Sequence, residues 1–217
     1  MKYDQIDDVI RILKKEVKKW EVPVVTEVSR ERSPFKVLIS CMLSLRTKDE
    51  VTRKASKRLF KLAETPISMQ NLDPKTIENA IYPVGFYKTK TKNIINVSKT
   101  LVEKYNSKVP DDIDELLKLK GVGRKTANLV ITLGYNQLGI CVDTHVHRIS
   151  NRIGYVNTKT PKETEFALRK ILPKEYWIIY NDILVTYGQN ICKPISPFCS
   201  ICKIEQYCDK VGVLKSR

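Results

Sequence analysis

The chain has 217 residues, of which 42% are hydrophobic, so it is long enough to bury the core of one or two domains. Its 39 lysines and arginines against 24 aspartates and glutamates give a net charge of +15, which favours a polyanionic partner, nucleic acid ahead of a membrane surface. No apolar run approaches the ~18 residues that cross a bilayer, and the first residues lack the apolar core of a signal peptide. We therefore expect a cytoplasmic protein whose six cysteines form no disulfides.

The N-terminal segment has the apolar spacing of an amphipathic helix. Apolar residues recur at helical intervals over residues 4–20, lysines fill the other face, and Asp4 is the expected N-cap. Residues 21–32 are predicted to form a connector. Ser33 and Pro34 then predict a helix start, because serine is a favoured cap and proline fits the first helical position. The residues that follow are apolar on nearly every side, so we expect this helix to be buried.

Aspartates at helix starts and a glycine-containing turn organise the next part of the chain. Helices are predicted over residues 49–62 and 73–81, each beginning at an aspartate. Residues 83–88 predict a turn with two aromatic side chains, and the lysine-rich helix after it is expected to end near Tyr105.

A tight bend between two helical patterns is predicted within Leu119–Ala127. Gly121 and Gly123 lack a Cβ, so the backbone can turn sharply and approach a ligand closely, while Val122 can point inward as an anchor. Amide groups of the bend and of the following helix start form an anion site, and in a basic protein the expected anion is a nucleic-acid phosphate. A plain helix–turn–helix connector is the alternative. Lys125, two residues past the second glycine, favours the phosphate-binding interpretation.

The C-terminal half continues as helices. A loop is predicted over residues 134–139, a helix from Val142–Thr144 to Ile153, and a capping-box start at Thr160–Glu163. Residues 175–187 predict an aromatic-rich helix that ends at Gly188. No segment alternates with period two, so we predict an all-α fold of roughly ten short helices. The N-terminal helix is expected to pack with the C-terminal third, giving two helical lobes with a cleft.

Four cysteines near the C-terminus have the spacing C-x6-C-x2-C-x5-C, close enough to surround one metal centre: Cys192, Cys199, Cys202 and Cys208. Zinc usually takes two C-x2-C pairs, whereas one close pair and a long loop suit a larger iron–sulfur cluster, so the spacing favours iron–sulfur over zinc and both over disulfides. Cys41 and Cys141 lie in apolar runs and are predicted to be buried thiols. Lys193, with Pro194 and Pro197, predicts a stiff basic loop that contacts phosphate or simply shapes the ligand loop.

The hairpin segment Leu119–Ala127, the segment Val142–Val146 and the cysteine spacing, in this order, resemble endonuclease III, a helix–hairpin–helix, iron–sulfur family of DNA glycosylases. The resemblance runs from the Ser33–Pro34 helix to Cys208, nearly the whole chain. It implies removal of oxidised pyrimidines from duplex DNA, followed by cleavage of the strand at the abasic site. It also implies a nucleoid-associated protein with no membrane partner, and a monomer is usual for the family.

The same resemblance implies a domain organisation. Residues 24–140 are expected to form a six-helix barrel that contains the helix–hairpin–helix, and residues 1–23 with 141–217 are expected to form a second domain. The second domain is expected to hold a 4Fe–4S cluster on the four C-terminal cysteines. A DNA-binding cleft is expected between the two domains.

The family pattern makes Lys125 the nucleophile and Asp143 the catalytic carboxylate. The position of Lys125 in the first turn of a helix disfavours its ammonium, and partial burial would lower its pKa in the same way, so a neutral amine could attack the sugar carbon C1′. Asp143 could stabilise positive charge that develops on the sugar, or help to activate the amine. A phosphate contact is the alternative role for Lys125, and a plain N-cap is the alternative role for Asp143.

A damaged base cannot be reached inside the stack, so it must be extruded and the gap must be filled. Phe86 stands where the family places an apolar wedge, and a core aromatic is the alternative. Arg46 occupies the position of the usual glutamine, and its longer, charged side chain lacks an acceptor. His145 is predicted to be an active-site neighbour or a phosphate contact. His147 is predicted to be an ordinary surface residue, since i, i+2 spacing prevents shared metal ligation with His145.

Two other functions remain open on the sequence. A mismatch-directed glycosylase of the same superfamily would excise adenine or thymine opposite guanine or its oxidised form, and Arg46 leaves room for this although Lys125 argues against it. A non-enzymatic DNA-binding or redox-sensing module would use the hairpin and the cluster but would not need Lys125 and Asp143.

Overall fold

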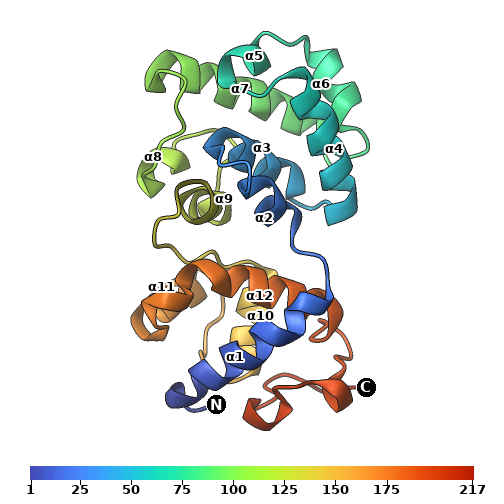
Figure 1. Cartoon of the computed structure of the whole chain (residues 1–217), viewed down its shortest axis with the longest axis vertical. Helices are drawn as coiled ribbons and strands as arrows, with labels where there is room; N and C mark the ends of the chain where they lie inside the picture. The colour runs from blue at the N-terminus through green and yellow to red at the C-terminus, as the bar shows by residue number, and fades with distance from the viewer. The chain divides into compact units, whose positions relative to one another are not determined.

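The computed structural model describes residues 1–217, and every regular element in it is a helix, so the all-α prediction is confirmed. The chain divides into two compact units (Figure 1). The middle unit consists of residues 24–139, and the terminal unit joins residues 1–23 to residues 140–217. None of the helices has both the length and the apolar character that a membrane span requires.

The middle unit is organised around a buried helix, α3, which contacts α2, α4, α7 and α9. The unit contains eight α-helices: α2 (Val24–Ser29), α3 (Pro34–Ser44), α4 (Asp49–Leu62), α5 (Pro66–Gln70), α6 (Pro74–Ile81), α7 (Tyr87–Tyr105), α8 (Ile113–Leu117) and α9 (Arg124–Leu129). A π-helical turn, Val130–Gly134, continues α9. Nearly all of α3 is buried, as its apolar sequence predicted.

The predicted caps of the middle unit are present. The Ser33 hydroxyl accepts a hydrogen bond from the Lys36 amide at 3.3 Å, and Pro34 is the first residue of α3. The Asp73 carboxylate accepts from the amides of Lys75 and Thr76 at 2.9 and 3.2 Å. These bonds satisfy amide groups that have no partner inside the helix, so both helices begin where the sequence predicted.

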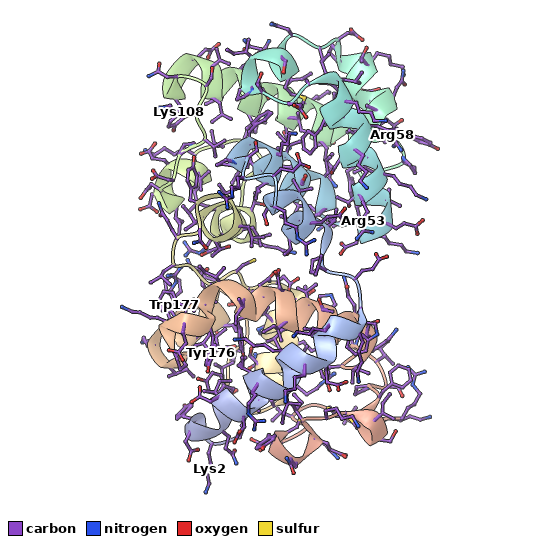
Figure 2. The ribbon with its side chains drawn as sticks, in the orientation of Figure 1. Lys2, Arg53, Arg58, Lys108, Tyr176 and Trp177 are labelled. Atoms are coloured by element: carbon purple, nitrogen blue, oxygen red, sulfur yellow. The ribbon has the colours of Figure 1, made fainter.

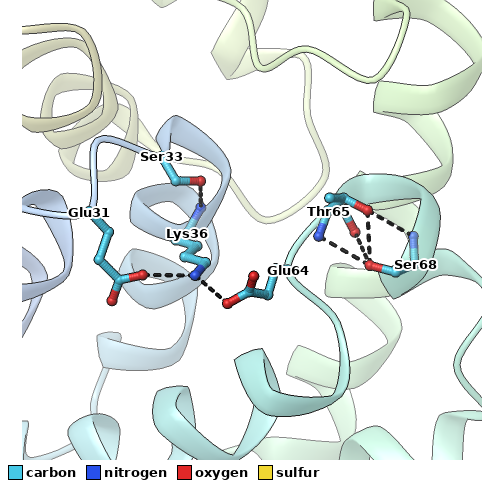
Figure 3. A network of polar contacts seen from close by, with 6 residues as sticks. All are labelled: Glu31, Ser33, Lys36, Glu64, Thr65 and Ser68. Atoms are coloured by element: carbon cyan, nitrogen blue, oxygen red, sulfur yellow. Dashed lines mark hydrogen bonds and ion pairs between the residues drawn. The ribbon is translucent and has the colours of Figure 1, made fainter.

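The prediction of a connector over residues 21–32 is wrong, because α2 lies within it. Val24, Val25 and Val28 are buried on one face of this short helix, which packs on α3. Figure 3 shows how the chain between these helices is held: the Lys36 ammonium lies 2.7 Å from a carboxylate oxygen of Glu31 and 2.5 Å from one of Glu64. Tertiary contacts thus stabilise a helix too short to be stable alone.

A second unpredicted helix, α5, begins with a capping box, also drawn in Figure 3. The Thr65 hydroxyl accepts from the Ser68 amide and the Ser68 hydroxyl accepts from the Thr65 amide, each at 3.1 Å. Serine in place of the usual glutamate or glutamine hid this signature in the sequence.

The terminal unit brings the N-terminal helix together with the C-terminal third of the chain. Its helices are α1 (Ile6–Glu16), α10 (Thr144–Arg152), α11 (Pro161–Ile171) and α12 (Trp177–Asn190), with 3-10 turns at Tyr3–Gln5, Val17–Lys19, Lys174–Tyr176, Cys199–Ile201 and Glu205–Tyr207. The apolar stripe of α1 shares one core with the buried residues of α10, α11 and α12. The Tyr176 hydroxyl, labelled in Figure 2, donates to Asp7 of α1 at 2.8 Å.

Two predicted helix boundaries in the terminal unit are wrong. Asp4 is not an N-cap, because it lies inside the 3-10 turn that precedes α1. Gly188 does not end the aromatic-rich helix, which continues to Asn190. A Cβ at Gly188 would lie 2.5 Å from His145 Nδ1 and 2.9 Å from an Arg148 nitrogen, so glycine is needed there for the close approach of α12 to α10.

Candidate active site and metal centre

The two glycines of the hairpin between α8 and α9 have different structural roles. Gly121 has a φ of +83°, and a Cβ there would lie 2.7 Å from the side-chain nitrogen of Asn93. Gly123 has a φ of −103°, and a Cβ there would meet nothing within 4 Å. Val122 is 7% exposed and its amide donates to the Leu119 carbonyl at 3.0 Å. The bend itself therefore requires Gly121, whereas Gly123 leaves open space beside the start of α9.

Lys125 is the second residue of α9 and is half-buried, while the two residues after it, Thr126 and Ala127, are fully buried. Burial raises the pKa of the Cys41 thiol in α3 to about 12, and the positive charge of Lys125 opposes this rise. Lys125 thus lies in the first turn of α9, a helix that packs on α3 and whose N-terminal end repels positive charge.

Asp143 is the N-cap of α10. Its Oδ1 atom accepts from the amides of His145 and Val146 at 2.8 and 3.0 Å, and its carbonyl accepts from the His147 amide at 2.9 Å. Asp143 therefore caps α10, which is the alternative role that the sequence predicted for it. The two bonds to its side chain go to the same carboxylate oxygen, and a carboxylate has two oxygens that accept hydrogen bonds, so capping and a second role are chemically compatible.

Two histidines of α10 have different surroundings. His145 Nδ1 lies 3.1 Å from an Arg148 nitrogen in the same helix. His147 is partly buried, and its Nδ1 lies 2.6 Å from the Thr164 hydroxyl and 3.3 Å from the Asn151 amide. The prediction that His147 is an ordinary surface residue is therefore wrong, because it belongs to a polar network that joins α10 to α11.

The four C-terminal cysteines line one pocket, together with apolar side chains that include Ile149, Ile153, Ile191, Ile204 and Phe198. Hydrogen-bond donors face three of the sulfur atoms. An Arg152 nitrogen lies 3.3 Å from Cys192 Sγ, the Tyr187 hydroxyl 3.2 Å from Cys202 Sγ, and the Lys210 amide 3.4 Å from Cys208 Sγ. Donors to sulfur stabilise thiolate ligands, so the chemistry of the pocket fits a metal cluster.

No disulfide joins the six cysteines in the structure, and Cys41 and Cys141 are buried, as their apolar surroundings predicted. Burial raises the pKa of the Cys208 thiol to about 11 and also raises the pKa of Cys202. Metal binding must therefore displace protons from these groups. No three His, Cys, Asp or Glu side chains converge on a position for a single metal ion.

Two arginines of α10 bind the first part of the cysteine loop, and sequence reasoning missed them. Arg148 donates to the Cys192 carbonyl at 2.8 Å, and Arg152 donates to the carbonyls of Lys193 and Pro194 at 2.8 and 3.1 Å. Their i, i+4 spacing on the helix that Asp143 caps was the available signal. The Lys193 ammonium lies 6.0 Å from the centre of the Phe198 ring, so its side chain lies beside an aromatic ring of the same loop.

Arg46 and Phe86 lie side by side on the surface of the middle unit. The Arg46 guanidinium is 5.7 Å from the centre of the Phe86 ring. Phe86 is 63% exposed, so the alternative that it is a core aromatic is wrong. Both residues have positive φ, 54° and 58°. Lys90, which sequence patterns gave no role, is buried against the residues on either side of Arg46, and its spacing to the buried Ile94 and Val97 was the signal that it faces inward.

Comparison with known proteins identifies the family. Residues 39–174 match the model of the HhH-GPD superfamily base excision DNA repair protein. The chain belongs to this family. It is 49% identical over 180 residues to the endonuclease III of Thermotoga maritima, covering 83% of this chain and 84% of that protein. The chain spans about half the length of two chloroplastic endonuclease III homologues of Arabidopsis thaliana that it also matches.

Solved structures give the same answer for the fold. A non-covalent endonuclease III–DNA complex matches with a TM-score of 0.86 and 36% identity over 97% of this chain and 96% of that one. A trapped covalent endonuclease III–DNA intermediate matches with a TM-score of 0.84 and 34% identity over 97% of both chains. The protein is a base excision DNA glycosylase of the endonuclease III type, a bifunctional enzyme that is also an abasic-site lyase, as the resemblance predicted.

Proposed function

We propose that Lys125 is the nucleophile and Asp143 the catalytic carboxylate of this enzyme, and that its substrates are oxidised pyrimidines and abasic sites in duplex DNA. The observation that carries the proposal is the position of Lys125 in the first turn of α9, directly after the double-glycine hairpin, in a chain of a base excision family. The enzyme acts as a monomer on nucleoid DNA in the cytoplasm.

The chemistry follows from a neutral amine. The lone pair of Lys125 Nζ attacks C1′ of the extruded nucleotide, the C1′–N bond breaks, and the base leaves with the bonding electrons. Loss of a proton from nitrogen and opening of the sugar ring give an imine between Lys125 and C1′. The imine acidifies C2′, so loss of a C2′ proton expels the 3′ phosphate and cuts the strand. The N-terminal end of α9 favours the neutral amine over the ammonium.

Asp143 has the complementary role of stabilising positive charge on the sugar as the base departs. Its place at the start of α10, with Oδ1 already bonded to two amides, keeps the carboxylate in one orientation. An oriented carboxylate costs no reorganisation when the charge develops, which is what makes preorganised groups effective.

DNA binding is assigned to three sets of residues. Gly121, Val122 and Gly123 receive a backbone phosphate, and the open space at Gly123 supports close approach there. His145 and Lys193 contact phosphates from the terminal unit. The exposed pair Arg46 and Phe86 fills the gap that an extruded nucleotide leaves, and their contact on the surface supports a shared role.

The cysteine pocket is assigned a 4Fe–4S cluster, held by Cys192, Cys199, Cys202 and Cys208. When bound, the cluster supplies four covalent cross-links that fix a tail with few buried apolar side chains, a structural contribution. The donors from Arg152, Tyr187 and the Lys210 amide support thiolate ligands at this position.

Borohydride trapping tests the assignment of the nucleophile. With an abasic duplex, the wild-type chain should give a covalent protein–DNA adduct, because borohydride reduces the imine to a stable amine. Lys125→Ala should give no adduct. Lys108→Ala, which replaces an exposed lysine labelled in Figure 2, should be trapped as the wild type is.

The role of Asp143 is tested by Asp143→Asn. This variant retains a capping side chain, so it should keep the melting temperature of the wild type and lose at least about 100-fold in single-turnover rate.

Equal trapping by Lys125→Ala would overturn the assignment of the nucleophile, and a wild-type rate for Asp143→Asn would show that Asp143 is a helix cap alone.

One observation favours a second substrate class, mismatched adenine or thymine: the exposed Arg46 occupies the position where the family usually has glutamine. Comparing excision from thymine-glycol duplexes with excision from thymine and adenine mismatches decides between the two classes.

A further inference from the structure

Lys90 of α7 is a buried lysine with three hydrogen-bond acceptors around its ammonium. Lys90 as a whole is 7% exposed. Its Nζ donates to the carbonyl oxygens of Leu43 and Leu45, each at 2.6 Å, and to the Thr47 hydroxyl at 3.1 Å. An ammonium has three donors, so the three acceptors match its capacity. All three belong to the end of α3 and the loop that contains Arg46.

The turn that contains Phe86 is attached to the same loop. The Thr47 hydroxyl that accepts from Lys90 also accepts from the Gly85 amide at 3.2 Å. A Cβ at Gly85 would lie 2.8 Å from the Arg46 carbonyl oxygen, so the two backbones are in close contact. Arg58 of α4, labelled in Figure 2, holds the preceding part of the turn by donating to the carbonyls of Ala80 and Tyr82.

The conformations of Arg46 and Phe86 need this support. Both are left-handed, with φ of 54° and 58°, and such a conformation costs a residue with a side chain of the order of 1 kcal/mol. Unfavourable conformations persist where surrounding contacts determine them. Here the contacts come from Lys90, Thr47 and Gly85.

We propose that Lys90 is a positioning residue for base extrusion, which joins the Arg46 loop to the Phe86 turn so that both side chains meet DNA as one preformed unit. The proposal rests on the gap-filling role proposed above for Arg46 and Phe86. Extruding a base costs a few kcal/mol of unstacking, and side chains that are already ordered offset this cost without a further loss of entropy on binding.

A double-mutant cycle tests the proposal. Lys90→Met, close in size but without donors, is made in the wild type and in the Arg46→Ala, Phe86→Ala background, with Lys99→Met, an exposed lysine of α7, as the control. Single-turnover excision of a damaged pyrimidine from duplex DNA reports extrusion and chemistry together. Strand cleavage at a preformed abasic site, where no base is extruded, reports the lyase chemistry. Thermal melting checks the fold.

In the wild-type background, Lys90→Met should slow excision about tenfold or more, and it should slow abasic-site cleavage less than about threefold. In the Arg46→Ala, Phe86→Ala background, Lys90→Met should cause little further loss of the excision rate. Equal losses in the two reactions, or an undiminished effect of Lys90→Met in that background, would overturn the proposal. If Arg46→Ala, Phe86→Ala itself excised the base at the wild-type rate, the gap-filling role would be wrong and the Lys90 proposal would fall with it. Lys99→Met should match the wild type in every assay.

Discussion

The charge of a single buried lysine links the stability of the middle unit to pH. Burial lowers the pKa of Lys90 from 10.5 to about 8. Between these two values the unfolded chain binds a proton that the folded chain does not, so the free energy of unfolding rises with pH across this window. Below about pH 8 both states are protonated, and the folded state bears the full cost of the buried ammonium.

The expected result is therefore a difference that depends on pH. The unfolding free energy of the wild type minus that of Lys90→Met, measured by urea titration, should increase as the pH rises from about 8 to about 10. Subtracting the variant removes the titration of all other groups. A difference that stays flat or decreases over this range would show that the three acceptors fully compensate the burial of the charge.

Residue identity predicted some of these features and not others. Ser33, Asp73 and Asp143 cap helices because capping depends on a side chain and the amides two or three residues later, which are local. Whether Asp143 does more than cap could not be read from the sequence, since capping requires nothing but an oxygen. The role of Lys90 could not be predicted either, because its acceptors are 43 to 47 residues away in the chain.

At the scale of elements, the two glycines of the hairpin between α8 and α9 are expected to have different roles: Gly121 stabilises the fold, and Gly123 allows DNA to approach. Gly121→Ala should lower the unfolding free energy by about 1–2 kcal/mol, because its φ is positive and a Cβ would press on Asn93. Gly123→Ala should leave stability within about 0.5 kcal/mol, because a Cβ there meets nothing within 4 Å and a φ of −103° suits any residue.

DNA binding should respond in the opposite order. If a phosphate approaches the hairpin at Gly123, Gly123→Ala weakens duplex binding about tenfold in a titration at fixed salt, while the melting temperature stays constant. Binding by Gly123→Ala as tight as the wild type would contradict a phosphate at this position.

The helices themselves were predictable where the sequence signals were local. Proline and a capping serine or aspartate gave the starts of α3 and α6, Asp49 gave the start of α4, and the apolar spacing gave α1. The short helices α2 and α5 were missed, because helices of six and five residues form through packing on neighbours and not through propensity. Gly188 was wrongly predicted to end a helix. Glycine is needed at this position because α10 lies close to it, and such a tertiary contact cannot be seen in the sequence.

At the scale of the molecule, the terminal unit is assembled from the two ends of the chain. Val9, Ile10 and Leu13 of α1 lie in one core with residues that begin at Ile140. Partly buried aromatic and cysteine residues of the tail pack against this core, among them Phe198, Tyr207 and the ligand candidates Cys192, Cys202 and Cys208. The tail after α12 has two 3-10 turns as its regular structure, so its order depends on this packing and on the proposed cluster.

Loss of the cluster should therefore affect one unit of the molecule. Cys208→Ala should abolish the brown colour and broad visible absorption of an iron–sulfur protein, and lower the melting temperature by about 10 °C if several kcal/mol of cross-linking are lost. Hydrogen exchange, followed by segment, should accelerate in residues 1–23 and 140–217, because their core packs against the cysteine tail, and change little in residues 24–139, which have their own core around α3. Cys141→Ala, a buried thiol outside the pocket, should keep the colour. Colour retained by Cys208→Ala, or faster exchange throughout residues 24–139, would contradict a cluster that stabilises the terminal unit.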